Sequence, residues 1–150
     1  MKKILVGIDG SQASINALKY AVKMARLLQA EIVGITVINE TSYSEYYKEI
    51  SNKLKKEAEG VLKRVVDGVQ KDGVTITTEV DIGIPDVILA QRAKTDPHVA
   101  MIVTSEGRRG LGARVFIVSK AHALVDQIAM GLSCPVLVVP GNNEDFLKWI

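Results

Sequence analysis

Two loops carry most of the residues that could bind a nucleotide or a phosphate group. Asp9, Gly10 and Ser11 directly follow the apolar run 4–8, and the segment 105–112 combines glycines with arginines. Glycine lets a backbone approach phosphate oxygens closely, and arginine supplies the complementary charge. In an open α/β sheet, ligands bind at the carboxyl ends of the strands, where the winding direction reverses. If both loops lie at such a point, they predict a nucleotide or phosphate site.

Other chemistries lack the residues that they need. His98 and His122 have no cysteine or glutamate at ligand spacing, so we expect no metal site. Cys134 has no neighbouring base and precedes an apolar strand, which is typical of an inert structural thiol. The sequence contains neither a Gly-x-Ser-x-Gly nucleophile elbow nor a Walker loop. We therefore expect no catalytic residues.

An alternation of strands and helices must position the two loops. Continuous apolar runs predict buried parallel strands, and apolar residues at helical spacing predict helices. The predicted strands are 4–8, 31–38, 74–81, 99–104 and 135–139, and the predicted helices are 12–28, 43–70, 85–93 and 119–130. This order predicts an α/β fold with an open, five-stranded parallel sheet and helices on both faces.

Local signals refine this outline. The segment 74–81 alternates apolar and polar residues, which predicts a half-exposed edge strand. Asp72-Gly73 is predicted to stop the second helix, with Gly73 in a left-handed conformation. No linker or repeat divides the chain, so we expect one domain over 1–140 and a tail over 141–150.

Composition and charge limit the partners and the compartment. The 150 residues are 47% hydrophobic, and 19 basic against 17 acidic side chains give a net charge of +2. That small excess argues against nucleic acid or a membrane as the main partner. The single cysteine excludes an internal disulfide, and the first apolar run is too short for a signal peptide. We therefore expect a cytoplasmic protein.

Five short segments share an order and a spacing with a known family. They are Val6-Gly7-Ile8-Asp9-Gly10-Ser11, Thr36-Val37-Ile38-Asn39-Glu40, Gly83-Ile84-Pro85, Met101-Ile102-Val103 and Cys134-Pro135-Val136-Leu137-Val138-Val139. Together they resemble the universal stress protein family over about residues 2–139. The resemblance implies an adenine nucleotide alpha hydrolase-like fold with strand order 3-2-1-4-5. It also implies a homodimer, as is common in the family. ATP or AMP is a possible ligand, and Mg²⁺ would bind only together with a nucleotide.

The same resemblance implies a set of nucleotide-binding residues. The aspartate after the first strand, Asp9, would reach the nucleoside, and the backbone of Val37 would meet the adenine. The family's phosphate motif is Gly, two residues, Gly, nine residues and then Gly-Ser or Gly-Thr. The candidate nucleotide-binding residues are therefore Asp9, Gly10, Ser11, Val37, Gly107, Arg108, Gly110 and Ser119.

This sequence departs from the last part of the phosphate motif. Lys120-Ala121 stands where Gly-Ser belongs, and the nearest equivalent, Val118-Ser119, replaces the glycine by a β-branched residue. Valine neither adopts positive φ easily nor lets the backbone approach a phosphate. The helix N-terminus predicted at Ser119 would still attract an anion. We therefore expect weak or absent ATP binding.

Structural roles compete with these binding roles. Asp9 could instead stabilise a turn, and either Ser11 or Ser14 could cap the first helix. Likewise, Arg108 could be a solvated loop residue, and Ser119 could be a helix cap.

The leading hypothesis is a small regulatory binding module of the universal stress type with an unknown protein partner. The alternative is a member that binds ATP and hydrolyses it slowly. A phosphoacceptor receiver domain is rejected, because this sequence lacks the clustered acids and the lysine of that class.

The last strand predicts an interface between two copies. Val136, Leu137, Val138 and Val139 are uniformly apolar, yet the implied strand order puts them at an edge of the sheet. An apolar edge with unpaired backbone groups must be covered. Antiparallel pairing with the same strand of a second copy would cover it, which predicts a homodimer. The alternative cover is the tail, through Phe146, Leu147, Trp149 and Ile150.

Overall fold

The computed structural model describes residues 1–39, 48–105, 126–128, 130–140 and 147–148. Strands and helices alternate along the chain, as the hydrophobic pattern predicts. The elements are β1 (Lys2–Gly7), α1 (Gln12–Leu28), β2 (Ala30–Asn39), α2 (Lys48–Gly68), β3 (Ile76–Gly83), α3 (Pro85–Thr95), β4 (Val99–Ser105) and β5 (Val136–Val139).

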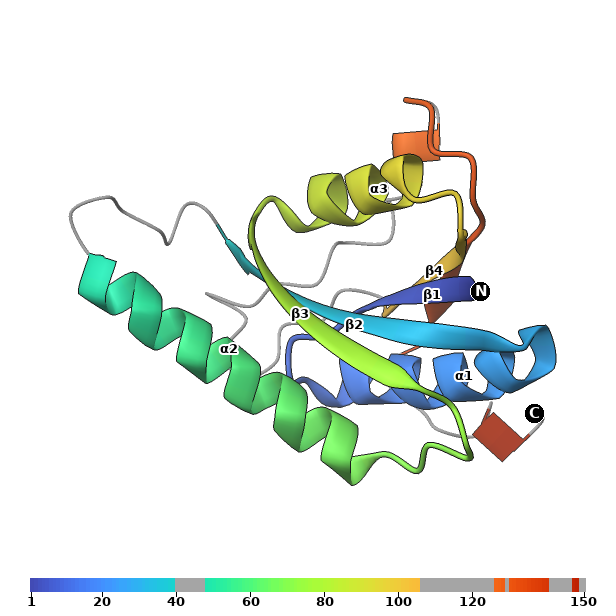
Figure 1. Cartoon of the computed structure of the whole chain (residues 1–150), viewed down its shortest axis with the longest axis horizontal. Helices are drawn as coiled ribbons and strands as arrows, with labels where there is room; N and C mark the ends of the chain where they lie inside the picture. The colour runs from blue at the N-terminus through green and yellow to red at the C-terminus, as the bar shows by residue number, and fades with distance from the viewer. Residues whose placement is uncertain (40–47, 106–125, 129, 141–146, 149–150) are drawn as a thin grey trace.

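The five strands form one parallel sheet in the order β3-β2-β1-β4-β5. This order confirms the one implied by the family resemblance and puts β1 at the centre. Helices α1 and α2 cover one face of the sheet, and α3 covers the opposite face (Figure 1). The chain therefore winds outward from β1 in one direction through β2 and β3, and then in the other through β4 and β5.

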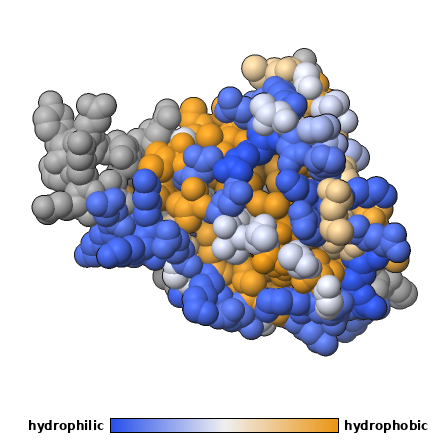
Figure 2. All heavy atoms as spheres, in the orientation of Figure 1, coloured by the Kyte–Doolittle hydropathy of each residue, from blue (hydrophilic) through white to orange (hydrophobic). Residues whose placement is uncertain are grey.

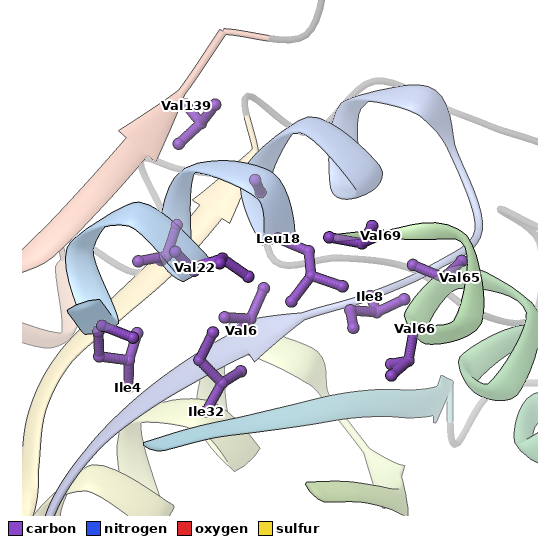
Figure 3. Close-up of a cluster of buried hydrophobic side chains, with 14 of the residues drawn as sticks. Ile4, Val6, Ile8, Leu18, Val22, Ile32, Val65, Val66, Val69 and Val139 are labelled. Atoms are coloured by element: carbon purple, nitrogen blue, oxygen red, sulfur yellow. The ribbon is translucent and has the colours of Figure 1, made fainter. Parts of the chain in front are cut away.

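Each face of the sheet buries its own hydrophobic cluster. On the face of α1 and α2, Ile4, Val6 and Ile8 pack against Leu18, Val22 and the last turns of α2 (Figure 3). On the face of α3, alternate residues such as Leu5 and Ile102 pack against Leu89. The central strands thus have apolar side chains on both faces, which is why their sequences are continuous apolar runs.

The second helix ends earlier than the sequence predicts. It stops at Gly68, before the predicted bound at residue 70, and the Lys71 ammonium donates to the carbonyl oxygens of Val66 at 2.9 Å and Val69 at 3.4 Å. A side chain that satisfies these last carbonyls lets the helix end without a glycine cap. Gly73 does adopt a left-handed φ of +83°, but in the turn that leads to β3.

The other predicted bounds differ by a few residues. β3 begins at Ile76 and continues to Gly83, because it pairs with β2 as far as Asn39. Of the predicted helix 119–130, the described residues are 126–128, which are helical, and Met130, which lies in a turn. The predicted start of the second helix at residue 43 lies outside the described residues.

β3 is an exposed edge strand, as its alternating sequence predicts. Figure 2 shows a hydrophilic outer side on α2 and hydrophobic side chains that reach the surface between α2 and α3. On this edge the Arg92 guanidinium pairs with the carboxylates of Glu79 and Asp81, the second at 3.3 Å. Charged side chains on an edge strand oppose pairing with other chains. No helix among the described residues has both the length and the apolarity that a membrane span requires.

Two leucines of α1 test how strongly packing on the sheet stabilises the fold. Leu18 is fully buried, whereas Leu27 is 73% exposed. We expect Leu18→Ala to lower the free energy of unfolding by about 2–5 kcal/mol, because it leaves a cavity in the cluster. Leu27→Ala should change it by less than about 0.5 kcal/mol. Urea unfolding followed by circular dichroism measures both, and equal effects of the two variants would contradict this packing.

Candidate functional site

The point where the winding reverses lies at the carboxyl end of β1. β1 has β2 on one side and β4 on the other, so the direction in which successive strands are added reverses at β1. Ligands of open α/β sheets bind in the crevice at such a point. The turn 9–11, the end of β2 and the end of β4 therefore form the part of the candidate site that the structure describes.

A hydrogen-bonded turn links β1 to α1. Asp9 is 3% exposed, and its Oδ1 accepts hydrogen bonds from the Ser11 amide, at 2.8 Å, and from the Ser11 hydroxyl. The Ser14 amide donates to Ser11 Oγ at 3.2 Å, so Ser11 is the N-cap of α1. The Ser14 hydroxyl accepts from the Asp9 amide at 3.3 Å and donates to the Ser11 carbonyl at 3.0 Å. The structural role predicted for Asp9 and the cap predicted at Ser11 are thus both confirmed.

Gly10 lets this turn lie close to α2. Its φ is +83°, and a Cβ atom at this position would lie 3.0 Å from Val61 Cγ1 and 3.4 Å from Arg64 Nη2. Helix α2 therefore brings the exposed Arg64 guanidinium beside the turn. Arg64 cannot be singled out in the sequence, because nothing distinguishes it from the other charged residues on the polar side of α2. Only the packing of α2 against the loop shows its position.

β2 continues past the end of β1. The last β1–β2 pair is Gly7 with Ile35, and the Ile8 amide then donates to the Ile35 carbonyl at 2.9 Å. Alternate residues of a parallel strand turn their main chain toward alternate neighbours. The main chain of Val37 therefore faces the side of β1 at a level where β1 has ended. This main-chain edge lies next to the turn at Asp9.

Ser105 ends β4 on the other side of β1. It is 1% exposed, and its buried Oγ has no hydrogen-bond partner among the described residues. The sequence analysis included Ser105 only as the first residue of the basic loop. A polar residue that ends an otherwise apolar strand is the signal that could have singled it out. Gly107, Arg108, Gly110 and Ser119 lie outside the described residues.

The remaining candidates lie away from this edge. Val136–Val139 form β5, at the edge of the sheet beyond β4. Cys134 packs against the hydrophobic cluster under α3, and burial raises the pKa of its thiol, which keeps the thiol protonated. Among the described residues, no group of His, Cys, Asp and Glu could hold a metal ion.

Two cavities lined by described residues also lie elsewhere. One of about 190 Å³ is formed by α1, the segment after α2 and Leu147, and one of about 400 Å³ lies at the amino end of the sheet, near Met1 and Gln29. Leu147 of the tail lines the first of these cavities. Phe146, Trp149 and Ile150, the other residues predicted to cover the edge of β5, lie outside the described residues.

Known proteins are similar to this chain over nearly its whole length. It is 31% identical over 149 residues to a universal stress protein of Methanocaldococcus jannaschii, covering 96% of this chain and 85% of that protein. It is 32% identical over 149 residues to the universal stress protein YxiE of Bacillus subtilis, covering 91% and 97%.

Solved structures share the fold. The hypothetical protein MJ0577 matches with a TM-score of 0.74 at 25% identity, covering 95% of this chain and 97% of that one. A universal stress protein in complex with cAMP matches with a TM-score of 0.66 at 20% identity, covering 92% and 96%. A universal stress family protein from Arabidopsis thaliana with AMP bound matches at 0.63 and 18% identity, covering 97% and 95%.

The match to a family agrees with the strand order and with the position of the site. The model of the universal stress protein family matches residues 1–140. The sheet order, the turn after β1 and the two similar curated proteins all agree with that match. The chain belongs to the universal stress protein family.

Proposed function

We propose that this protein binds an adenine mononucleotide at the carboxyl edge of β1, β2 and β4 and acts as a regulatory module. The observation that carries the proposal is the main chain of Val37, which faces the side of β1 beyond the end of that strand. A main-chain donor and acceptor side by side match the hydrogen-bonding edge of adenine. Related folds have been solved with AMP and with cAMP, which supports the same class of ligand here.

Asp9 is the group next to Val37 that would contact the sugar. The turn uses its Oδ1, so the carboxylate is held in one orientation. Its Oδ2 would accept a hydrogen bond from a ribose hydroxyl, and a bond to a charged acceptor is stronger than one between neutral groups. The nucleoside thus has two contacts that do not depend on the loop 106–125.

The altered phosphate motif favours a mononucleotide over a triphosphate. Val118 occupies the place of a motif glycine, and its branched side chain hinders the close approach of the loop backbone to a long phosphate chain. Hydrolysis of ATP, the alternative function, would also need a bound Mg²⁺ and a positioned water. Asp9, the acid described at this edge, already takes part in the turn. We therefore propose binding and signalling rather than catalysis.

Calorimetric titration with AMP, cAMP, ATP and adenosine tests this function. We expect AMP to bind at least as tightly as ATP, and Asp9→Asn to weaken AMP binding about five- to tenfold while it keeps the acceptor for Ser11. Asp67→Asn is the matched control, because this exposed acid pairs with Lys63 on the surface of α2. A sub-micromolar dissociation constant for ATP, or no binding of any of these ligands, would overturn the proposal.

We also propose that the regulatory unit is a homodimer paired through β5. β5 pairs with β4 on one side and stands last in the sheet. Val138 is 39% exposed there, whereas Leu137 packs partly against the main hydrophobic cluster. Antiparallel pairing with β5 of a second copy would satisfy the unpaired backbone groups and bury Val138.

Light scattering after size exclusion tests the dimer. We expect a dimer at micromolar concentration and a monomer for Val138→Lys, because two buried lysines would face each other across the twofold axis. Leu27→Lys introduces the same charge at a site that is 73% exposed and should leave the dimer intact. A monomeric wild-type protein at micromolar concentration would refute the proposed interface.

A further inference from the structure

The cavity between α1 and the segment after α2 has the size and the lining for one aromatic ring. Its volume is about 190 Å³, and an apolar cavity of about 150 Å³ is large enough to hold a benzene molecule. Its most buried lining residues are Val22, 1% exposed, and Val69, 4% exposed, which both belong to the main hydrophobic cluster (Figure 3). Lys19, Lys23 and Asp72 add charged groups around these valines.

The tail of the chain reaches this cavity through Leu147. Leu147 is half-buried and lines the cavity, and residues 147–148 form a short 3-10 turn beside the second half of α1 (Figure 1). Trp149 follows two residues after Leu147, so at most about 7 Å of chain separates the two. The single tryptophan of the sequence is therefore within reach of a cavity that fits an aromatic ring.

We propose that this cavity binds the indole of Trp149, so that the tail docks between α1 and the end of α2. A lysine ammonium is attracted to the face of an aromatic ring, and tryptophan is the ring that attracts it most strongly. Lys19 and Lys23 line the cavity from successive turns of α1. Phe146 is as near to Leu147, but its ring is smaller and attracts a cation less, so the cavity is assigned to Trp149.

A tail docked at this cavity leaves the outer edge of β5 open. The segment after α2 leads into β3, which stands at the opposite end of the sheet from β5. The indole then covers Val22 and Val69, and not Val138 on the edge strand. The tail thus stabilises the fold of its own chain, while the edge of β5 stays available to a second copy.

The methyl NMR signals of three valines test where the indole binds. An aromatic ring displaces the signals of methyl groups that lie against its face. We therefore expect the signals of Val22 and Val69 to move on Trp149→Ala, whereas those of Val138 should stay in place. Movement of the Val138 signals with Val22 and Val69 unchanged would put the indole over β5 and overturn the proposal. Unchanged signals of all three valines would overturn it as well.

Fluorescence gives an independent readout, because Trp149 is the only tryptophan. We expect the folded protein to emit at a shorter wavelength than the urea-unfolded protein, and to be quenched less by acrylamide. Emission and quenching equal to those of the unfolded protein would contradict a docked indole. Emission that reverts to the unfolded value on dilution would also contradict it, because the indole would then bind to a second copy.

Thermal melting measures how much the docked indole stabilises the fold. Trp149→Ala should lower the melting temperature by about 4 °C or more, because it exposes the apolar cavity to water. Trp149→Phe keeps a ring and should lower it by less. Leu27→Ala is the matched control, because it removes a side chain of α1 that is 73% exposed. It should change the melting temperature by about 1 °C or less. Equal melting temperatures for Trp149→Ala and the wild-type protein would refute the docking.

Discussion

The peptide groups of Ile8 determine where the central strand ends and therefore where a ligand can bind. The Ile8 amide donates to the Ile35 carbonyl at 2.9 Å, and the Ile8 carbonyl accepts from the Thr36 hydroxyl at 2.7 Å. Gly34 leaves room for the Ile8 side chain, because a Cβ atom there would lie 2.9 Å from Ile8 Cδ1. The chain turns away directly afterwards at Asp9, and the main chain of Val37 is left facing an open edge.

The polar groups of the candidate site lie on a scaffold that is stabilised by hydrophobic packing away from the site. Two hydrophobic clusters hold the sheet between its helices, and neither depends on the hydroxyl of Ser105. The turn at Asp9 satisfies its own polar groups through Ser11 and Ser14, so it keeps its shape without a ligand. A site of this kind is preformed, which lowers the entropic cost of binding.

The sequence predicted those features that depend on short-range patterns. Apolar runs and helical spacing were enough for the strands, for α1 and for the exposed edge at β3, and the family resemblance supplied the strand order. The end of α2 was misplaced, because Lys71 reaches back to satisfy the last carbonyls and no local pattern shows such a contact. Arg64 and Ser105 became visible only in three dimensions, because helix packing places the first and the lack of a partner distinguishes the second.

The most direct test of a nucleotide site at this edge is an amide nitrogen–proton correlation spectrum of the labelled protein during titration with AMP. The account predicts saturable shifts of the amide signals of Val37, Gly10 and Ser105, which come from three separate elements that meet at the carboxyl edge. Shifts confined to the cavity near Met1 and Gln29, at the opposite end of the sheet, would contradict it. An unchanged spectrum at millimolar AMP would contradict it as well.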